Sequence, residues 1–165
     1  MTMTHPTWQL DVDNGALVLT PCPGTKGTDL DASLEQLKAQ GVQAIVTALD
    51  DAELASKDVA ALGEKANALG MQWFQIEIED DCAPGDAFAA KWQTASPALH
   101  NVVDNGGKVA VHCMGGSGRT GLLAAHLLLE KNWPLAEIVT QVQALRPGAF
   151  TKPIQVDYIN GVASK

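Results

Sequence analysis

The segment Val42–Ala48 is almost entirely apolar and carries no charge, although charged residues make up 18% of the chain. Runs of this kind are typical of strands that are buried on both faces, and such strands occur in parallel sheets covered by helices. A further buried strand is expected at Lys108–His112, and segments with helical periodicity separate the two. This alternation predicts an α/β fold with a central, mostly parallel sheet flanked by helices.

The other expected elements are bounded by glycine, proline or capping residues. In chain order they are a hairpin of Trp8–Val12 and Ala16–Thr20, a helix ending at Gln40, a helix over Glu53–Leu69, a strand over Met71–Ile78, and helices over Asp86–Val103, Thr120–Lys131, Pro134–Leu145 and Pro153–Asn160. Asp29 and Asp31 are both candidates for the N-cap of the first helix. Pro97 is expected to kink or split its helix, because proline has no amide hydrogen.

Length and charge restrict the class of protein. With 165 residues, 46% of them hydrophobic, the chain fits one domain spanning residues 1–165. The formal net charge of -8 argues against a nucleic acid or an anionic membrane as partner, because either would need a basic surface. No partner of these two kinds is therefore expected.

The cellular location is inferred from the N-terminus and the cysteines. Residues Met1–His5 lack the charged and apolar regions of a secretory signal, and no apolar stretch reaches membrane-spanning length. The three cysteines are Cys22, Cys82 and Cys113, an odd number at wide spacing that suits a reducing compartment. A cytoplasmic location is therefore expected.

The most informative segment lies between the strand Lys108–His112 and a strongly apolar helix. Glycine removes the steric barrier to unusual backbone angles, so a glycine-rich loop can turn successive N–H groups inward. The N-terminus of the following helix adds a partial positive charge. The loop is therefore expected to bind phosphate through its backbone, and its residues are Met114, Gly115, Gly116, Ser117 and Gly118.

Cys113 stands directly before this loop, where a thiolate could attack a bound phosphate. An ordinary cysteine thiol is mostly protonated at neutral pH, so nearby groups must stabilise the anion. The loop amides, the helix terminus, the Arg119 charge and the Thr120 hydroxyl are expected to do so. Arg119 is also expected to grip phosphate with two parallel N–H bonds, which a lysine could not supply. His112 is expected to hold the shape of the loop and not to act as the base.

The leaving group of a phosphate ester needs a proton, so a general acid is expected on another loop. Asp80 and Asp81 are the candidates, because they follow the predicted strand Met71–Ile78 in a loop that contains Pro84 and Gly85. A solvated acidic turn without a catalytic role is the alternative for this pair.

The loop resembles the signature of the cysteine-based protein phosphatases, in which His-Cys is followed by a short loop, an arginine and then Ser or Thr. The matching residues are His112, Cys113, Arg119 and Thr120. Further stretches are similar to the kinase-associated phosphatase branch of the dual-specificity group, namely Pro23-Gly24, Leu37–Val46, Ala52–Leu54, Ile78–Pro84 and Leu145–Ala149. The resemblance implies a phosphotyrosine protein phosphatase-like fold, a phosphorylated protein as substrate, and no metal or organic cofactor.

The resemblance also assigns roles. The family's general acid lies at a fixed distance before a loop proline, which selects Asp80 over Asp81. A late glutamine positions the hydrolytic water in this family, and Gln155 occupies the matching place. Met114 replaces a frequent lysine, and Ser117 is neutral where inositol-lipid phosphatases tend to be basic. These departures argue against a phosphoinositide substrate, and they leave phosphotyrosine and phosphoserine or phosphothreonine both open.

Two other functions would use the same loop. A non-catalytic module could bind phosphoproteins through it, or the thiolate could transfer sulfur or reduce an oxyanion. The presence of Cys113, Arg119 and an acid candidate argues against the binding module. The five-residue gap between Cys113 and Arg119 and the Thr120 hydroxyl favour phosphate over the other chemistries. A nucleotide-binding loop is not expected, because the Gly-Lys-Ser/Thr ending is absent.

Other chemically active side chains are expected to be structural. Cys22 and Cys82 are interpreted as small buried residues, although Cys82 is close enough in sequence to the acid loop to be a redox partner of Cys113. Arg146 is expected to cap a helix end, with support of the phosphate loop as the alternative. No metal site is expected, because the remaining histidines lack ligand spacing and should lie at the surface or on a helix face: His5, His100 and His126.

Overall fold

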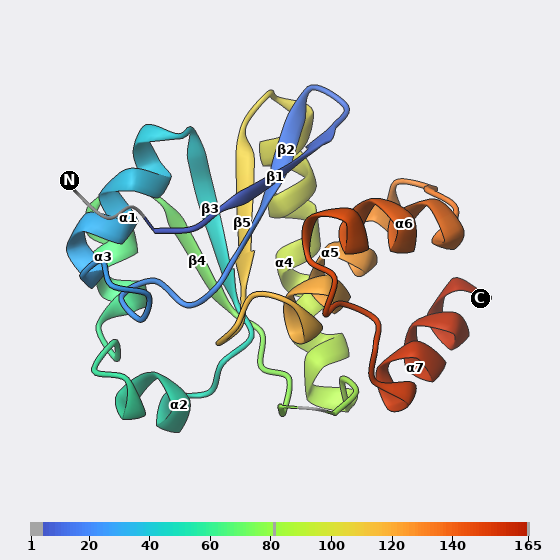
Figure 1. The fold of residues 1–165 in the computed structure, drawn as a ribbon. Coiled ribbons are helices and arrows are strands. Elements are labelled where there is room, and N and C mark those ends of the chain that lie inside the picture. The colour runs from blue at the N-terminus through green and yellow to red at the C-terminus, as the bar shows by residue number, and fades with distance from the viewer. Residues whose placement is uncertain (1–4, 81, 165) are drawn as a thin grey trace.

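The centre of the molecule is a five-stranded sheet with the order β1-β2-β5-β3-β4 (Figure 1). The computed structural model describes residues 5–80 and 82–164. The strands are β1 (Trp8–Val12), β2 (Gly15–Thr20), β3 (Val42–Thr47), β4 (Gln72–Gln75) and β5 (Lys108–His112). Only β1 runs antiparallel to its neighbour, and the other pairings are parallel. The predicted hairpin and the predicted mostly parallel sheet are thus confirmed.

Helices cover both faces of this sheet. They are α1 (Leu30–Ala39), α2 (Asp51–Ser56), α3 (Leu62–Ala68), α4 (Asp86–Asp104), α5 (Gly118–Glu130), α6 (Leu135–Leu145) and α7 (Pro153–Ala163). Helices α1 and α3 lie on one side, α4 and α5 on the other, and α6 and α7 pack outside α5 (Figure 1). The predicted α/β class with flanking helices is confirmed.

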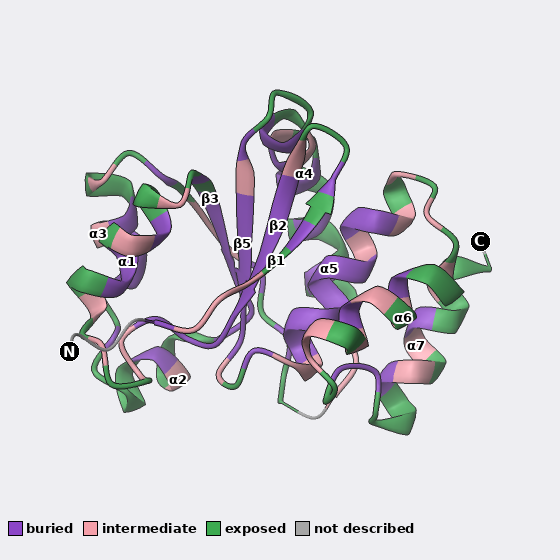
Figure 2. Ribbon diagram, turned by 45° about the horizontal axis from the view of Figure 1, so that its top comes forward, coloured by how far each residue is buried: buried purple, intermediate pink, exposed green. Residues whose placement is uncertain are grey.

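The hydrophobic core has two parts, one on each face of the sheet. The smaller part joins the sheet to α1 and α3 through residues such as Leu34, Ile45 and Ala66. The larger part joins it to α4 and α5 through residues such as Leu99 and Leu123. Burial on both faces explains why β2, β3 and β5 are almost wholly buried (Figure 2). Their carboxyl ends meet at one edge, so the loops that follow them lie side by side.

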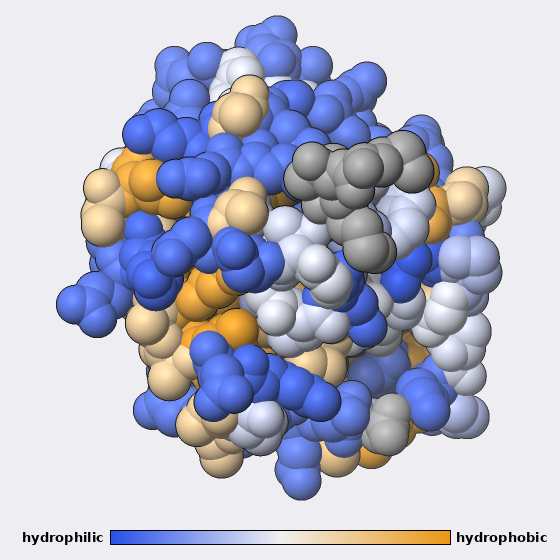
Figure 3. Space-filling model, turned by 60° about the vertical axis from the view of Figure 1, so that its left-hand side comes forward, coloured by the Kyte–Doolittle hydropathy of each residue, from blue (hydrophilic) through white to orange (hydrophobic). Residues whose placement is uncertain are grey.

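The surface over α1 and α3 is largely hydrophilic, with small separate apolar patches (Figure 3). Across the described parts of the chain, no helix combines the length and the apolar character that crossing a bilayer requires.

The prediction of one helix over Glu53–Leu69 is wrong. Helix α2 ends at Ser56, because the Val59 amide donates to the Leu54 carbonyl at 3.0 Å and the Asp58 amide donates to Ala55 at 3.1 Å. This is the Schellman pattern, which needs a left-handed residue, and Asp58 has φ +57°. Glycine usually takes this position, so an aspartate there hid the helix end in the sequence.

Other boundaries differ in smaller ways. Strand β4 stops at Gln75, although the Ile76 amide still donates to the Thr47 carbonyl at 2.8 Å. Helix α5 begins at Gly118, before the predicted Thr120, and α7 continues beyond Asn160 to Ala163.

Two open questions about the helices are settled by the structure. Asp29 caps α1 by accepting from the Ala32 amide at 2.7 Å, whereas Asp31 pairs with Lys65. Helix α4 is not split at Pro97. Pro97 and Gln93 are both exposed, so water can reach the carbonyl that loses its partner.

Candidate active site

The loop between β5 and α5 forms one wall of a pocket of about 350 Å³. The pocket is lined by Asp80, Cys113, Met114, Gly115, Ser117, Gly118, Arg119, Gly148, Thr151, Lys152 and Gln155. Gly116 belongs to the same loop and has φ +83°; a Cβ there would lie 2.7 Å from the backbone nitrogen of Pro21. Only glycine therefore allows the loop to pack this closely against the end of β2.

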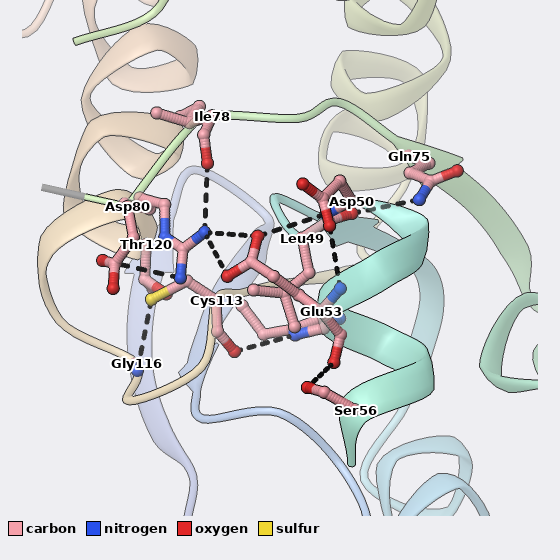
Figure 4. Close-up of polar contacts among 12 residues, drawn as sticks. Leu49, Asp50, Glu53, Ser56, Gln75, Ile78, Asp80, Cys113, Gly116 and Thr120 are labelled. Atoms are coloured by element: carbon pink, nitrogen blue, oxygen red, sulfur yellow. Dashed lines mark hydrogen bonds and ion pairs between the residues drawn. The ribbon is translucent and has the colours of Figure 1, made fainter. Parts of the chain in front are cut away.

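The Cys113 sulfur accepts two hydrogen bonds inside the pocket (Figure 4). The Gly116 amide donates to Sγ at 3.3 Å, and the Thr120 hydroxyl donates at 3.1 Å. The first turn of α5 has no side-chain cap and its first residues, Gly118 and Arg119, line the pocket, so the helix terminus adds a partial positive charge there. Cys113 is only 4% exposed. These donors can stabilise a thiolate.

The guanidinium of Arg119 is hydrogen-bonded on one side and makes an ion pair with Asp80 on the other. Its Nη1 donates to both carboxylate oxygens of Glu53 at 3.0 Å and to the Ile78 carbonyl at 3.0 Å (Figure 4). Its Nε is buried and has no hydrogen-bond partner among the described residues, and Nη2 lies 3.6 Å from Asp80. The edge that carries Nε and Nη2 is therefore available for an oxyanion.

Glu53 has a role in the site that was not expected from the sequence. Its amide donates to the Asp50 side chain at 2.8 Å, and the Asp50 amide donates back to Glu53 at 3.3 Å, which forms a capping box at the start of α2. The same carboxylate then anchors Arg119. The Asp50-x-x-Glu53 pattern in the sequence is typical of a capping box. Its second role was hidden, because Arg119, which Glu53 also binds, lies 66 residues further along the chain.

His112 holds the first carbonyl of the loop. Burial lowers the pKa of His112 to about 4, so its ring carries one proton at neutral pH. The Cys113 carbonyl can only accept, so this proton is on Nδ1, which donates to it at 3.2 Å. Nε2 then accepts from the Thr47 hydroxyl at 2.7 Å, and Thr47 accepts from Trp73 Nε1 at 2.8 Å. The geometry matches the expected support of the loop.

The acid loop and α7 close the pocket from the other side. Asp80 lines the pocket and its side chain is 70% exposed. Asp81 lies outside the described residues. Gln155 is 1% exposed; its Nε2 donates to the Cys82 carbonyl at 3.1 Å, and its Oε1 has no partner among the described residues. Asp80 and Gln155 thus come together with Cys113, as the sequence suggested.

Arg146 is the C-cap of α6, as expected, and it also supports the phosphate loop, which was the alternative role. Its Nε donates to the Gly116 carbonyl at 3.0 Å, and its Nη2 donates to the Gly115 carbonyl at 2.8 Å. The sequence could not decide between the two roles, because the contact spans two elements that are distant along the chain.

Cys22 is buried behind the loop, in agreement with the structural reading, and its amide donates to the Met114 carbonyl at 3.0 Å. Burial, and then the nearby Cys113 and Glu53, raise the pKa of Cys22 to about 12, so this thiol stays protonated at neutral pH. Cys82 is half-buried and its thiol is free of disulfides.

The expectation that His5 lies at the surface or on a helix face is wrong. His5 is 1% exposed and its Nε2 lies 2.6 Å from the Thr20 hydroxyl. No group of three or more potential metal ligands occurs within residues 5–80 and 82–164. A reaction without metal stays a prediction.

A mostly parallel sheet that presents a cysteine to a loop amide and a helix hydroxyl, beside an anchored arginine, is typical of the cysteine-dependent phosphatases. Comparison with known proteins narrows this class. The chain belongs to the dual specificity phosphatase family: the model described as dual specificity phosphatase, catalytic domain, matches residues 27–157.

Several individual proteins are similar to this chain. Tyrosine-protein phosphatase CDC14 of Saccharomyces cerevisiae is 32% identical over 88 residues, which are 53% of this chain and 15% of that protein. Dual specificity protein phosphatase 26 of Rattus norvegicus is 30% identical over 82 residues, 48% of this chain and 38% of that protein. The match therefore covers well under half of these relatives' length.

Solved structures share the whole fold. Kinase associated phosphatase, with its catalytic site cysteine substituted by serine, superposes with a TM-score of 0.87 at 23% identity, over 99% of this chain and 97% of that one. Tk-PTP in its active form gives a TM-score of 0.72 at 23% identity, over 90% and 92%. At these identities the likeness establishes the fold.

Proposed function

We propose that this protein hydrolyses phosphate monoesters on phosphorylated proteins through a phosphocysteine intermediate on Cys113. The observation that carries the proposal is the buried Arg119 Nε, which has no hydrogen-bond partner among the described residues, in the same pocket as a doubly hydrogen-bonded Cys113 sulfur. Because Glu53 and Ile78 occupy Nη1, the remaining N–H groups can grip two oxygens of one phosphate. The loop amides then bind the remaining non-ester oxygen of the phosphate group.

In the first step the Cys113 thiolate attacks phosphorus in line with the departing ester oxygen. The S–P bond forms, the P–O bond breaks, and Asp80 gives its proton to the leaving oxygen. Charge builds on the equatorial oxygens, where Arg119 and the loop amides are already placed. Preorganised donors stabilise this state without rearranging.

In the second step water attacks the phosphocysteine. Asp80, now a carboxylate, accepts a proton from the water, and the S–P bond breaks to release inorganic phosphate. The Gln155 Oε1, buried without a partner among the described residues, is available to accept the other water hydrogen. Thr120 and the Gly116 amide stabilise the returning thiolate.

The proposed substrates are proteins that carry phosphotyrosine, phosphoserine or phosphothreonine. Family membership supports phosphoprotein substrates, and the relatives are named as tyrosine-protein and dual specificity phosphatases. Within the loop, Met114 and Ser117 offer no charge to additional phosphates of an inositol lipid, and Lys152 is the one lysine among the described residues that line the pocket. The proposal also includes a single catalytic domain over residues 1–165 and a reducing, cytoplasmic setting in which the three cysteines form no disulfide.

Cys113→Ser tests the proposal directly. Turnover of an aryl phosphate should disappear, while the thermal unfolding midpoint stays close to that of the wild type, because serine is nearly isosteric with cysteine. Retained turnover would end the phosphocysteine mechanism. A folded wild-type protein that binds phosphopeptides without hydrolysing them would instead establish the non-catalytic binding module.

A further inference from the structure

The carbonyl groups of residues 113–117 all have partners outside the phosphate pocket. The donors are His112 Nδ1 to Cys113, the Cys22 amide to Met114, Arg146 to both Gly115 and Gly116, and the Gly121 amide to Ser117. One side chain, Arg146, therefore satisfies the two consecutive carbonyls in the middle of the loop. Without it, both carbonyls would have to find water or turn inward.

These carbonyls control the amides that face the sulfur. A trans peptide unit is planar, with its C=O and N–H groups pointing in opposite directions. No peptide bond among the described residues is cis. Holding the Gly115 carbonyl on Arg146 therefore directs the Gly116 N–H the opposite way, and that N–H donates to Cys113 Sγ at 3.3 Å. By the same geometry, the bond to the Gly116 carbonyl fixes the Ser117 N–H.

The guanidinium suits this task because Nε and Nη2 lie on one rigid edge. Arg146 is the C-cap of α6, and its own amide is held by the Val142 carbonyl at 2.7 Å. None of the ion pairs formed by residues 5–80 and 82–164 includes Arg146. Its partners are the two loop carbonyls and one aromatic ring.

That ring belongs to Trp8. The Arg146 guanidinium carbon lies 3.9 Å from the centre of the Trp8 ring, a distance typical of a cation–π contact. Trp8 is half-buried on β1, opposite Leu19 in the hairpin, and does not line the pocket. The hairpin thus provides a flat surface that keeps the guanidinium edge aimed at the loop.

We propose that Trp8 and Arg146 form a clasp that holds the phosphate loop in its oxyanion-binding conformation, which makes Trp8 a positioning residue for phosphate. The inference rests on the proposed phosphatase function. Removing the Trp8 ring frees the guanidinium to rotate into water, so the Gly115 and Gly116 carbonyls lose their donor and the loop amides lose their fixed direction. Oxyanion binding then weakens although no pocket residue has changed.

The test uses inhibition of aryl phosphate hydrolysis by inorganic phosphate. Trp8→Leu should raise the inhibition constant of phosphate about threefold to fivefold, the range that a partly exposed cation–π contact supports. Trp8→Phe keeps an aromatic face and should stay within about twofold of the wild type. Arg146→Lys keeps the charge but loses the two-pronged edge, and should raise the constant about tenfold or more.

Trp133→Leu is the matched control, because Trp133 is also a half-buried tryptophan, whereas the cation–π contact of Arg146 is with Trp8. It should leave phosphate inhibition unchanged. In a double-mutant cycle, Trp8→Leu should have almost no further effect once Arg146 is replaced by methionine, since both act through one contact. An equal effect in both backgrounds, or no effect of Trp8→Leu in an active enzyme, would overturn the clasp. A wild type without aryl phosphatase activity would overturn the underlying function instead.

Discussion

In the proposed mechanism the two arginines of the site have different roles. Arg146 lies outside the pocket and orients loop peptides, whereas Arg119 lines the pocket and offers one edge to phosphate. That edge is available only because Glu53 and the Ile78 carbonyl hold the opposite side of the guanidinium. Glu53 therefore determines where the phosphate-binding charge points.

Replacing Glu53 should impair catalysis without abolishing it. Glu53→Ala removes the carboxylate from a guanidinium that is 2% exposed, and loss of one partner from such a pair commonly costs about 2–5 kcal/mol. Part of that cost should be a loss of transition-state stabilisation, because the guanidinium is no longer held in place. We therefore expect kcat/KM to fall about tenfold to a hundredfold. Glu53→Gln keeps one acceptor and should lose less. Steady-state kinetics, with Glu64→Gln on the exposed side of α3 as control, would measure this; equal kcat/KM in all three variants would contradict it.

Asp80 should set the pH dependence of the first step. If Asp80 protonates the leaving oxygen, Asp80→Asn should lower kcat about a hundredfold to ten-thousandfold for an ester with a poor leaving group, and much less for an aryl phosphate with an acidic phenol. The fall in kcat toward high pH should also disappear. Asp81→Asn provides the comparison, and the assignment fails if this variant loses that limb while Asp80→Asn keeps it.

At the scale of the elements, α3 and β4 pack closely because α3 has a glycine, with no side chain, where the two elements meet. Gly63 lies in α3 directly against Trp73 of β4, and a Cβ at Gly63 would meet the indole carbon Cε3 at 2.2 Å. The absent methyl group therefore lets Trp73 reach Thr47, whose hydroxyl holds His112. Glycine is a poor helix former, and close packing against Trp73 explains its place in the first turn of α3.

A pair of glycine substitutions tests this packing. Gly63→Ala should destabilise the protein by about 1–3 kcal/mol, because Trp73 must shift. Gly161→Ala in α7 meets nothing within 4 Å and should stabilise the protein by about 0.5–1 kcal/mol, since alanine favours a helix. Urea unfolding of both variants measures these changes, and a destabilising Gly161→Ala or a neutral Gly63→Ala would refute the packing argument.

Features formed by one continuous segment of the chain could be predicted from the sequence, whereas features that join distant segments could not. The phosphate loop lies in one continuous segment after β5, so its glycines, Cys113 and Arg119 identified it without knowledge of the fold. Glu53 and Arg146 reach it only through the parallel pairing of β3 with β5 and the packing of α6, which no local pattern encodes. The end of α2 was missed for a different reason, since Asp58 takes a backbone conformation that is usually a glycine's.

Stability of the whole molecule should depend on pH through its buried histidines. Burial lowers the pKa of His112 and of His126 to about 4, and it lowers that of His5 from 6.5. Between about pH 6.5 and 4 the unfolded chain binds protons that the folded protein does not, so stability should decrease as the pH falls through this window. His112 and His126 should each account for at most about 3 kcal/mol of the decrease in the free energy of unfolding over this window.

His126→Gln separates one contribution from the rest. His126 contacts the Tyr158 hydroxyl at 2.7 Å and packs against the rings of Phe88 and Trp92. The free energy of unfolding of this variant should change less steeply than that of the wild type between pH 6.5 and 4. Denaturant unfolding at several pH values provides the measurement, and parallel curves for the two proteins would contradict the assignment.

In the proposed mechanism, the sheet, the loop and the supporting side chains together hold the Cys113 sulfur where it can take a phosphoryl group. The most direct test is rapid acid quenching of the wild-type protein with an aryl phosphate, followed by mass spectrometry of its peptides. We predict a phosphoryl group on Cys113 early in the reaction that disappears as inorganic phosphate is released. Phosphate release with no modified Cys113, or with the phosphoryl group on another residue, would contradict this account.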